Sequence, residues 1–270
     1  MKQKITAIKA QQKNKNRYNI FLDGTYAFSV SEDTLIKYRL LKGRELDKAD
    51  LEAIFKADDL AKALDFALNY LSYSLRTVAE TKKKLASLDL DDDQIEQVLQ
   101  KLAQMHLLDD LAYAKSYTRT IAKTSTNGPL KIALALKKKG VSANDIEDGL
   151  MEYTPEMQRV NATKAAKKVL KAGQKLSFNK TMQKITQTLM QKGFSTDIIA
   201  QVKKQLDYQK DEEDELSALQ TQAEKLWHKN QRLDPVKRKL KVKTALFRQG
   251  FSLTDCDHIL NELIQKDEVD

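Results

Sequence analysis

The sequence predicts a mainly α-helical protein: tandem three-helix repeats in an elongated curved array, preceded by a small N-terminal β-hairpin or three-stranded segment. Three observations support this fold class. The 270 residues include only 8 glycines and 3 prolines, fewer than a fold built from many turns needs. An Asp-Gly pair near the N-terminus separates two short runs rich in β-branched and aromatic residues. From about residue 58 onward, a helical pattern recurs with a period of roughly 50 residues.

The N-terminal residues predict strands. The runs Arg17–Leu22 and Thr25–Val30 flank Asp23–Gly24, a dipeptide that readily takes the positive φ angles of a type I′ turn. Ile5–Ala10 is a third candidate strand, and Ser31 is placed to cap a following helix. Because a lone hairpin is marginally stable in water, we expect it to pack on the third strand or on that helix.

Four segments of the helical part align without gaps. Each begins with a leucine, and the starts lie 51, 53 and 57 residues apart: Leu85, Leu136, Leu189 and Leu246. The sixth position is apolar in all four, and the fifth is glycine in the last three: Gly140, Gly193 and Gly250. Glycine at that position is typical of a left-handed helix C-cap. We therefore expect a helix end, an apolar anchor and then the capped start of the next helix.

A further helix precedes each aligned segment, which makes each unit a three-helix module. These helices are expected at Ala61–Ser72, Leu111–Thr124, Gln158–Ala172 and Glu215–Lys229. The predicted domains are the N-terminal strands plus a helix at 1–56, then repeats at 57–108, 109–156, 157–210 and 211–270. Modules of this size bury their apolar faces by stacking on their neighbours.

Local caps support the predicted helix starts. Thr77 and Glu80 fit a capping box. Gly128, Thr154 and Asp234 each precede a proline, a residue that suits the first position of a helix because its missing N–H would be unpaired there.

The strongest suggestion of a metal site is the acidic run Asp89–Asp93. Its spacing imitates the first ligands of a calcium-binding loop, but Gln94 and Gln100 stand where such a loop needs Gly and Glu. We therefore interpret these carboxylates as residues at the N-terminus of the helix Gln94–Leu102, where the helix dipole favours negative charge.

No other pattern indicates catalysis, so we expect a protein that is not an enzyme and uses neither metal nor cofactor. The three histidines lack metal-binding spacing, and the only cysteine, Cys256, stands where the other repeats have isoleucine, which favours a small core residue. No glycine-rich phosphate loop, Gly-x-Ser-x-Gly motif or pair of catalytic carboxylates occurs. The N-terminus lacks an apolar signal region and no apolar run could span a membrane, so the expected location is the cytoplasm.

The charge is concentrated in the third predicted repeat. The chain has a net charge of +9, and residues 157–210 hold 12 Lys and Arg against 2 Asp and Glu. Four lysines of this segment fall on one helical face, opposite an apolar face: Lys164, Lys167, Lys168 and Lys171. Either a solvated surface or a polyanion-binding stripe fits this pattern, and we favour the stripe.

A second basic region lies in the second repeat. Lys115, Arg119 and Lys123 are four residues apart on one predicted helix, and the next helix carries Lys131, Lys137, Lys138 and Lys139. These seven cations are further candidates for contact with DNA or a DNA-bound filament. The neighbouring Tyr113 and Tyr117 fit either core packing or base stacking. Trp227, the only tryptophan, fits either packing between repeats or an interface anchor, and we favour the packing.

The stretches LLDDLAYAKSYTRT and NGPLKIALALKKKGV resemble the RecX family of recombination regulators. The matching residues are Leu108, Asp109, Asp110, Ala114, Tyr117, Gly128, Pro129, Ile132, Leu136, Lys139, Gly140 and Val141. The resemblance covers residues 60–210 well, and the β start and fourth repeat look like those of longer members. Ser74 and Ala135 depart from the pattern, which often has Arg and Glu there. No filament contact is carried over to these two positions.

The resemblance implies a non-enzymatic, cytoplasmic protein that acts in DNA recombination and the SOS response. Family members bind the RecA recombinase filament on single-stranded DNA and restrain or sometimes modulate it, so inhibition is the expected direction here. The implied partners are the RecA filament and single-stranded DNA, with double-stranded DNA as a second candidate and a monomer as the expected state. A free-standing DNA-binding protein is the competing interpretation, and its binding would fall more steeply with salt.

Overall fold

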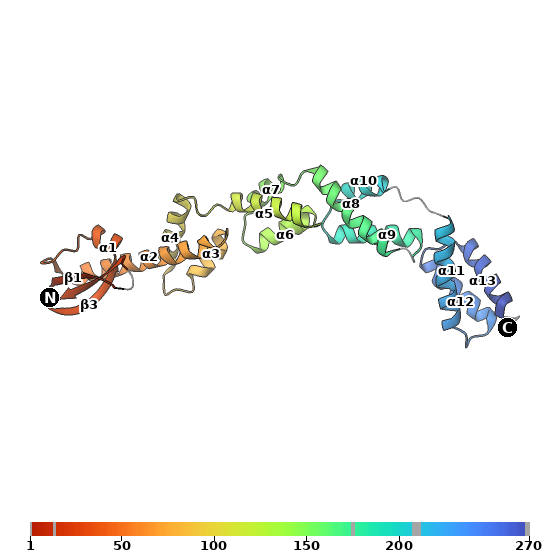
Figure 1. The fold of residues 1–270 in the computed structure, drawn as a ribbon, viewed down its shortest axis with the longest axis horizontal. Helices are drawn as coiled ribbons and strands as arrows, with labels where there is room; N and C mark the ends of the chain where they lie inside the picture. The colour runs from red at the N-terminus through yellow and green to blue at the C-terminus, as the bar shows by residue number, and fades with distance from the viewer. Residues whose placement is uncertain (1, 13–14, 174–175, 207–211, 268–270) are drawn as a thin grey trace. The chain divides into compact units, whose positions relative to one another are not determined.

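A computed structural model describes residues 2–12, 15–173, 176–206 and 212–267. In these residues the chain forms four β-strands and thirteen α-helices (Figure 1). All the helices except the first follow the last strand. The chain divides into two compact units: Met1–Ala114 with Leu136–Ile146, and Lys115–Ala135 with Glu147–Asp270. The predicted fold class, mainly helical with a small N-terminal sheet, is confirmed.

The N-terminal strands form one antiparallel sheet in the order β3-β2-β1-β4. The strands are β1 (Gln3–Ala10), β2 (Arg17–Leu22), β3 (Thr25–Ser31) and β4 (Glu45–Leu46). The hairpin turn is confirmed, because Asp23 and Gly24 have φ angles of 48° and 88°, both positive as a type I′ turn requires. The prediction missed β4, since a strand of two residues shows no alternation that a sequence pattern could reveal.

Two helices cover the sheet. Helix α1 (Glu32–Lys37) begins after Ser31, whose side chain accepts a hydrogen bond from the Thr34 N–H, as predicted. Helix α2 (Lys48–Ser72) contributes Ile54 to the core of the sheet and, further along, Ala63 and Ala67 to the core of the first repeat. One uninterrupted helix therefore runs through the predicted boundary at residues 56 and 57.

A buried carboxylate fixes α2 to the sheet. Asp58 is almost fully buried and accepts hydrogen bonds from Arg17 Nη2 at 2.8 Å and from the Ser31 N–H at 2.7 Å, while Lys62 Nζ lies 3.0 Å away. Burial by itself raises the pKa of Asp58, but these hydrogen bonds outweigh it and hold the pKa below the usual value. The sheet, the start of α1 and the middle of α2 thus share one charged anchor.

The remaining helices occur in threes. The first repeat contains part of α2 with α3 (Val78–Leu85) and α4 (Asp92–Gln104); the others contain α5 (Asp110–Thr124), α6 (Pro129–Lys138) and α7 (Ala143–Leu150), then α8 (Pro155–Ala172), α9 (Phe178–Gln191) and α10 (Thr196–Gln205), then α11 (Glu212–Lys229), α12 (Pro235–Arg248) and α13 (Leu253–Asp267). The predicted caps at Thr77, Thr154 and Asp234 are confirmed. Within the acidic run, Asp91 caps α4 and the next two carboxylates lie in its first turn, also as predicted.

The three C-cap glycines adopt the left-handed conformation that the repeat alignment predicts. Gly140, Gly193 and Gly250 have φ angles of 84°, 85° and 89°. The carbonyl just before each glycine accepts a hydrogen bond from the start of the second helix in the preceding repeat. The donors and acceptors are Thr77 Oγ1 to Lys139 O at 2.7 Å, the Gly128 N–H to Lys192 O at 2.7 Å, and Ser177 Oγ to Gln249 O. This repeat junction recurs three times in the described chain.

An acidic side chain completes two of the three junctions. Asp110 Oδ1 accepts a hydrogen bond from the Val78 N–H at 2.9 Å, and Glu215 Oε2 accepts one from the Phe178 N–H at 2.8 Å. Both donors are the first residues of second helices, whose N–H groups have no partner inside the helix. At the middle junction the equivalent residue is Pro129, which has no N–H to satisfy. Every junction therefore pairs or removes the same backbone donor.

The fourth repeat closes its own core around Trp227 and Cys256. Both are buried with Val242, Leu246 and other apolar residues of α11, α12 and α13, so the prediction that Trp227 packs between repeats was wrong. Burial raises the pKa of the Cys256 thiol to about 11, which suits the predicted inert core residue. The Trp227 indole donates to Asp267 at 2.9 Å, a contact within the repeat that its sequence position did not reveal.

We predict that Gly193→Ala destabilises its junction more than Gly43→Ala destabilises its own turn. Both glycines have positive φ, but an added Cβ would meet nothing at Gly43 and would lie 2.7 Å from the Lys131 nitrogen at Gly193. The control should cost about 1 kcal/mol, and Gly193→Ala about 2–4 kcal/mol because overpacking adds to the strain. The local free energies of opening of the two variants are measured by hydrogen exchange of the amides around each glycine. Equal costs would mean that the close approach is not real.

We predict that Asp58 makes the N-terminal sheet sensitive to acid. Because folding lowers the pKa of Asp58 from its ordinary value of 3.8, its contribution to stability is full above that value and is lost as the pH falls through the folded pKa. Asp58→Asn should cost at least about 2 kcal/mol at neutral pH. The neighbouring Asp59→Asn, a half-exposed residue paired with Lys62, is the control. The rate of proteolysis of residues 1–56 is compared between the two variants. Equal protection in both would refute the role of Asp58 as the anchor of the sheet.

Candidate nucleic-acid interface

Helix α8 presents the four lysines of the predicted stripe to solvent. Lys164, Lys167, Lys168 and Lys171 are all exposed, whereas the alanines at 162, 165 and 166 are buried against the rest of the third repeat. The two faces arise from one local pattern, since residues three and four apart share a side of a helix. None of the four lysines forms an ion pair within the described residues. Their charge is therefore available to an external anion.

A groove of about 410 Å³ runs along part of this face. It is lined by Glu156, Arg159, Val160, Thr163, Lys164, Lys167 and Gln205. Two of the stripe lysines thus belong to the groove, while Lys168 and Lys171 lie outside its lining. The Thr163 hydroxyl and Gln205 amide are donor groups of the kind that contact phosphate and sugar oxygens. Sequence reasoning missed Arg159, Thr163 and Gln205. Gln205 belongs to α10, and no local pattern links it to α8.

The basic face predicted on α5 is only partly free. Lys123 is exposed and Lys115 is half-buried. Arg119 pairs with Glu152 at 3.3 Å, but an exposed pair of this kind stabilises little and leaves the guanidinium near the surface. Lys131, on α6, is exposed.

The three consecutive lysines at the end of α6 have different roles. Lys137 and Lys138 are exposed. Lys139 Nζ lies 2.7 Å from Glu80 Oε1 and 5.5 Å from the centre of the Tyr113 ring. The hydrogen bond with Glu80 raises the pKa of Lys139 above its usual value. The charge of Lys139 therefore stabilises the junction between the first and second repeats. The sequence pattern did not indicate this role.

The candidate cations do not all belong to one compact unit. Lys137, Lys138 and Lys139 belong to the first unit, whereas Lys115, Arg119, Lys123, Lys131 and the four lysines of α8 belong to the second. Helix α8 carries four exposed lysines within eight residues, beside Arg159, which is half-buried and pairs with Glu156 at 3.3 Å. Within the second unit, this helix is the best-supported candidate for phosphate contact.

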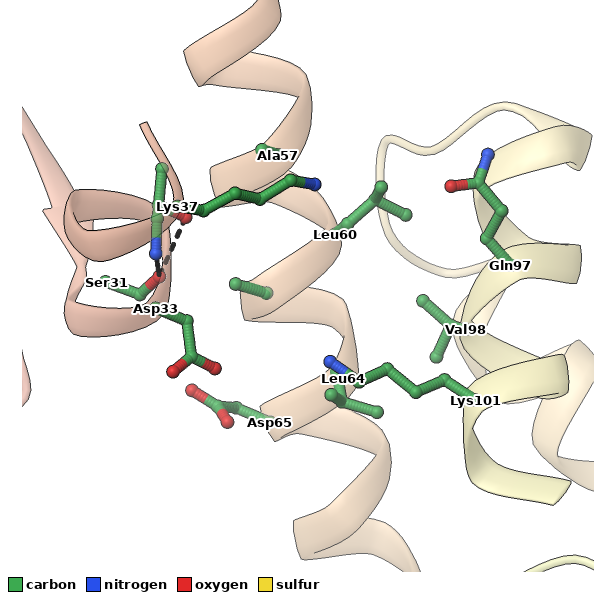
Figure 2. A pocket seen from close by; sticks show the side chains of 12 residues that line it. Ser31, Asp33, Lys37, Ala57, Leu60, Leu64, Asp65, Gln97, Val98 and Lys101 are labelled. Atoms are coloured by element: carbon green, nitrogen blue, oxygen red, sulfur yellow. Dashed lines mark hydrogen bonds between the residues drawn. The ribbon is translucent and has the colours of Figure 1, made fainter. Parts of the chain in front are cut away.

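A second cavity, of about 260 Å³, lies between α1, α2 and α4 (Figure 2). Leu60, Leu64 and Val98 form its apolar side, and Figure 2 shows the carboxylates of Asp33 and Asp65 pointing toward one another. Lys37 and Lys101 also line it, so its charge is mixed. It has none of the concentrated positive charge that would attract a nucleic acid.

Two kinds of feature, metal-ligand clusters and membrane-spanning helices, are absent from the described residues. They contain no cluster of three or more His, Cys, Asp or Glu side chains that could hold a metal ion. Among the same residues, no helix combines the length and apolar character that a membrane crossing requires. The arrangement offers exposed cations, a groove and structural hydrogen bonds.

Known proteins resemble the chain along nearly its whole length. Family models match in four places: the regulatory protein RecX N-terminal domain at residues 3–47, and the first, second and third RecX three-helix domains at 63–102, 109–150, and 158–202 with 212–260. The third three-helix model therefore matches both the third and the fourth repeats.

Curated relatives and solved structures agree with these matches. Regulatory protein RecX of Levilactobacillus brevis is 42% identical over 96% of this chain and 97% of its own, and that of Limosilactobacillus reuteri is 42% identical over 93% and 95%. A crystal structure of regulatory protein RecX superimposes with a TM-score of 0.70 at 43% identity, covering 75% of this chain and all of that one. A structure of RecX from Lactobacillus salivarius gives 0.55 at 43% identity, over 56% of this chain and 98% of that one. With four domain models in order and relatives this similar from end to end, the chain belongs to the RecX family of regulatory proteins.

Proposed function

We propose that this protein is a non-enzymatic regulator of homologous recombination that binds the RecA–DNA filament and lowers recombinase activity. Membership of a family of regulatory proteins supports a regulatory role. The observation that carries the DNA part of the proposal is the exposed lysine stripe of α8, which lies opposite a buried alanine face and forms no ion pair within the described part of the chain. Such a stripe suits a phosphate backbone.

The proposed DNA contacts centre on α8. Lys164 and Lys167 meet phosphates in the groove beside Arg159, and Lys168 and Lys171 extend the contact along the helix. The further proposed contacts, with DNA or with the filament's protein, are Lys115, Arg119, Lys123, Lys131, Lys137 and Lys138. Lys139 contributes to the scaffold instead, since Glu80 already neutralises it.

The proposed organisation follows the repeats. It places the N-terminal strands and a helix at 1–56 and three-helix repeats at 57–108, 109–156, 157–210 and 211–270. A monomer acting in the cytoplasm without metal or cofactor fits this scheme. Because a filament is periodic, several repeats of one chain would contact successive subunits, and linked contacts raise the overall affinity.

A free-standing DNA-binding protein is the second candidate. It is favoured by the α8 groove, whose cations and donors suit phosphate without any protein partner. The two functions differ in salt dependence, because pure phosphate binding weakens steeply as salt rises, whereas a filament contact with an apolar component keeps a salt-resistant part.

We predict that changing Lys164, Lys167, Lys168 and Lys171 to Gln flattens the salt dependence of single-stranded DNA binding. Each lost phosphate contact should reduce the slope of log K against log salt by roughly 0.7, so the total change should be about 2 to 3 units. The control is a quadruple Lys-to-Gln variant at exposed positions outside the third repeat: 42, 56, 82 and 83. Titrations at several salt concentrations measure both. If the two variants have equal slopes, the α8 stripe is only a solvated surface.

We predict that the protein inhibits strand exchange by the recombinase of the same bacterium at sub-stoichiometric amounts. One ligand with several tandem repeats, bound per several filament subunits, would suffice to block extension or turnover. Strand exchange is followed with increasing amounts of the protein, and the quadruple α8 variant should need several-fold more. Unchanged strand exchange at equimolar protein would refute inhibition, and DNA binding without any filament binding would favour the free-standing alternative.

A further inference from the structure

Helix α12 carries an exposed apolar stripe that its own repeat does not use. Val236, Leu240 and Phe247 are 78%, 68% and 55% exposed. Their spacing places them on one side of the helix, while Val242 and Leu246 on the opposite side fill the core of the fourth repeat. Single exposed apolar residues are ordinary, but an aligned row of large ones marks an interaction surface.

Both flanks of the stripe carry cations, but the cations differ in how exposed they are. On one flank, Lys239 and Lys243 are tied to α13, through Asn261 at 2.6 Å and Asp257 at 2.5 Å. On the other flank, Lys237, Lys241 and Arg248 are exposed. Lys237 makes only a solvent-exposed pair with its own cap Asp234 at 3.5 Å, which stabilises little. The stripe therefore has a row of available cations along one edge.

This combination fits an acidic protein surface that bears apolar side chains. Protein interfaces have an apolar centre with a polar or charged rim, and here the centre is apolar and the rim positive. Single-stranded nucleic acid is a poorer fit, because it binds by stacking on aromatic rings, and two of the three stripe residues are aliphatic. A symmetric pairing of two copies is also poorer, since the same cations would face each other across the two-fold axis.

The second repeat has a shorter exposed apolar pair on its own second helix, with cations at the same edge. On α6, Leu130 and Leu134 are 59% and 57% exposed, with the exposed Lys131 and Lys138 beside them. Leu130 stands six residues before the aligned leucine of its repeat, as Leu240 does in the fourth. On α9 of the third repeat, the positions that align with Val236 and Leu240 carry the exposed polar residues Asn179 and Gln183. The position that aligns with Phe247 carries Met190, which is 53% exposed. The repeat that carries the lysine stripe of α8 thus has only one of the three apolar residues of the row.

We propose that the stripe of α12, with its counterpart on α6, docks on the protein component of the filament through an acidic surface bearing apolar side chains. The inference rests on the proposed function and assigns its two contacts to different faces. DNA phosphates meet α8, whereas protein meets the second helices of the second and fourth repeats.

The test uses the full chain with three variants. V236S/L240S/F247S removes the apolar row, K237E/K241E reverses the charged edge, and I36S/L41S is the control, because those residues are 64% and 66% exposed on the N-terminal domain. Each protein is titrated against RecA filament assembled on a single-stranded oligonucleotide and against the same oligonucleotide bare. The fluorescence of Trp227, the only tryptophan and buried in the same repeat, reports whether the fourth repeat stays folded.

We expect the apolar variant to lose at least about tenfold in filament affinity at both low and high salt. The charge variant should lose affinity chiefly at low salt, and both should bind the bare oligonucleotide like the control. Filament affinity equal to that of the control would overturn the inference. So would an equal loss on the bare oligonucleotide, which would make the face a nucleic-acid surface. Failure of the unmodified chain to bind filament would overturn the proposed function as well.

Discussion

The repeats of this protein depend on one contact, in which a glycine turn of one repeat is seated on the helix start of the repeat before it. The turn can approach because glycine has no side chain: a Cβ on Gly140 would lie 2.3 Å from the Ala79 Cβ. The carbonyl before the glycine then reaches a hydroxyl or N–H donor of the earlier repeat. Close packing and backbone pairing are thus satisfied by the same few atoms, which fixes how consecutive repeats join.

This constraint explains why the residues that identify the family are structural. Asp109 caps α5 by accepting the Ala112 N–H at 2.8 Å, and Asp110 crosses to Val78 of the preceding repeat. Burial, the largest influence, raises the pKa of Asp110 despite the hydrogen bond from Val78. Gly128 lies so close to Gly193 that a Cβ added to Gly128 would be 2.5 Å from the carbonyl carbon of Gly193. These motifs build the scaffold and leave the outer helix faces free for binding.

The outer faces differ from repeat to repeat although the scaffold is repeated. The third repeat concentrates exposed lysines on α8, whereas α12 of the fourth exposes an apolar row edged by cations. Since junction residues point inward, surface residues can vary without affecting how the repeats join. A chain built this way can place a phosphate-binding face and a protein-binding face on different modules, which is what a ligand of a nucleoprotein filament requires.

The sequence by itself determined the helical repeat, the hairpin, the caps and the two faces of α8, because each follows from residues within about four positions of one another. The tertiary structure alone decided the rest. It joined Lys139 to Glu80, 59 residues earlier, placed Gln205 at the α8 groove, and buried Trp227 inside one repeat. It also showed α2 continuing from the sheet into the first repeat around Asp58. Such contacts join distant segments, and their partners depend on how the helices pack, so no local pattern in the chain specifies them.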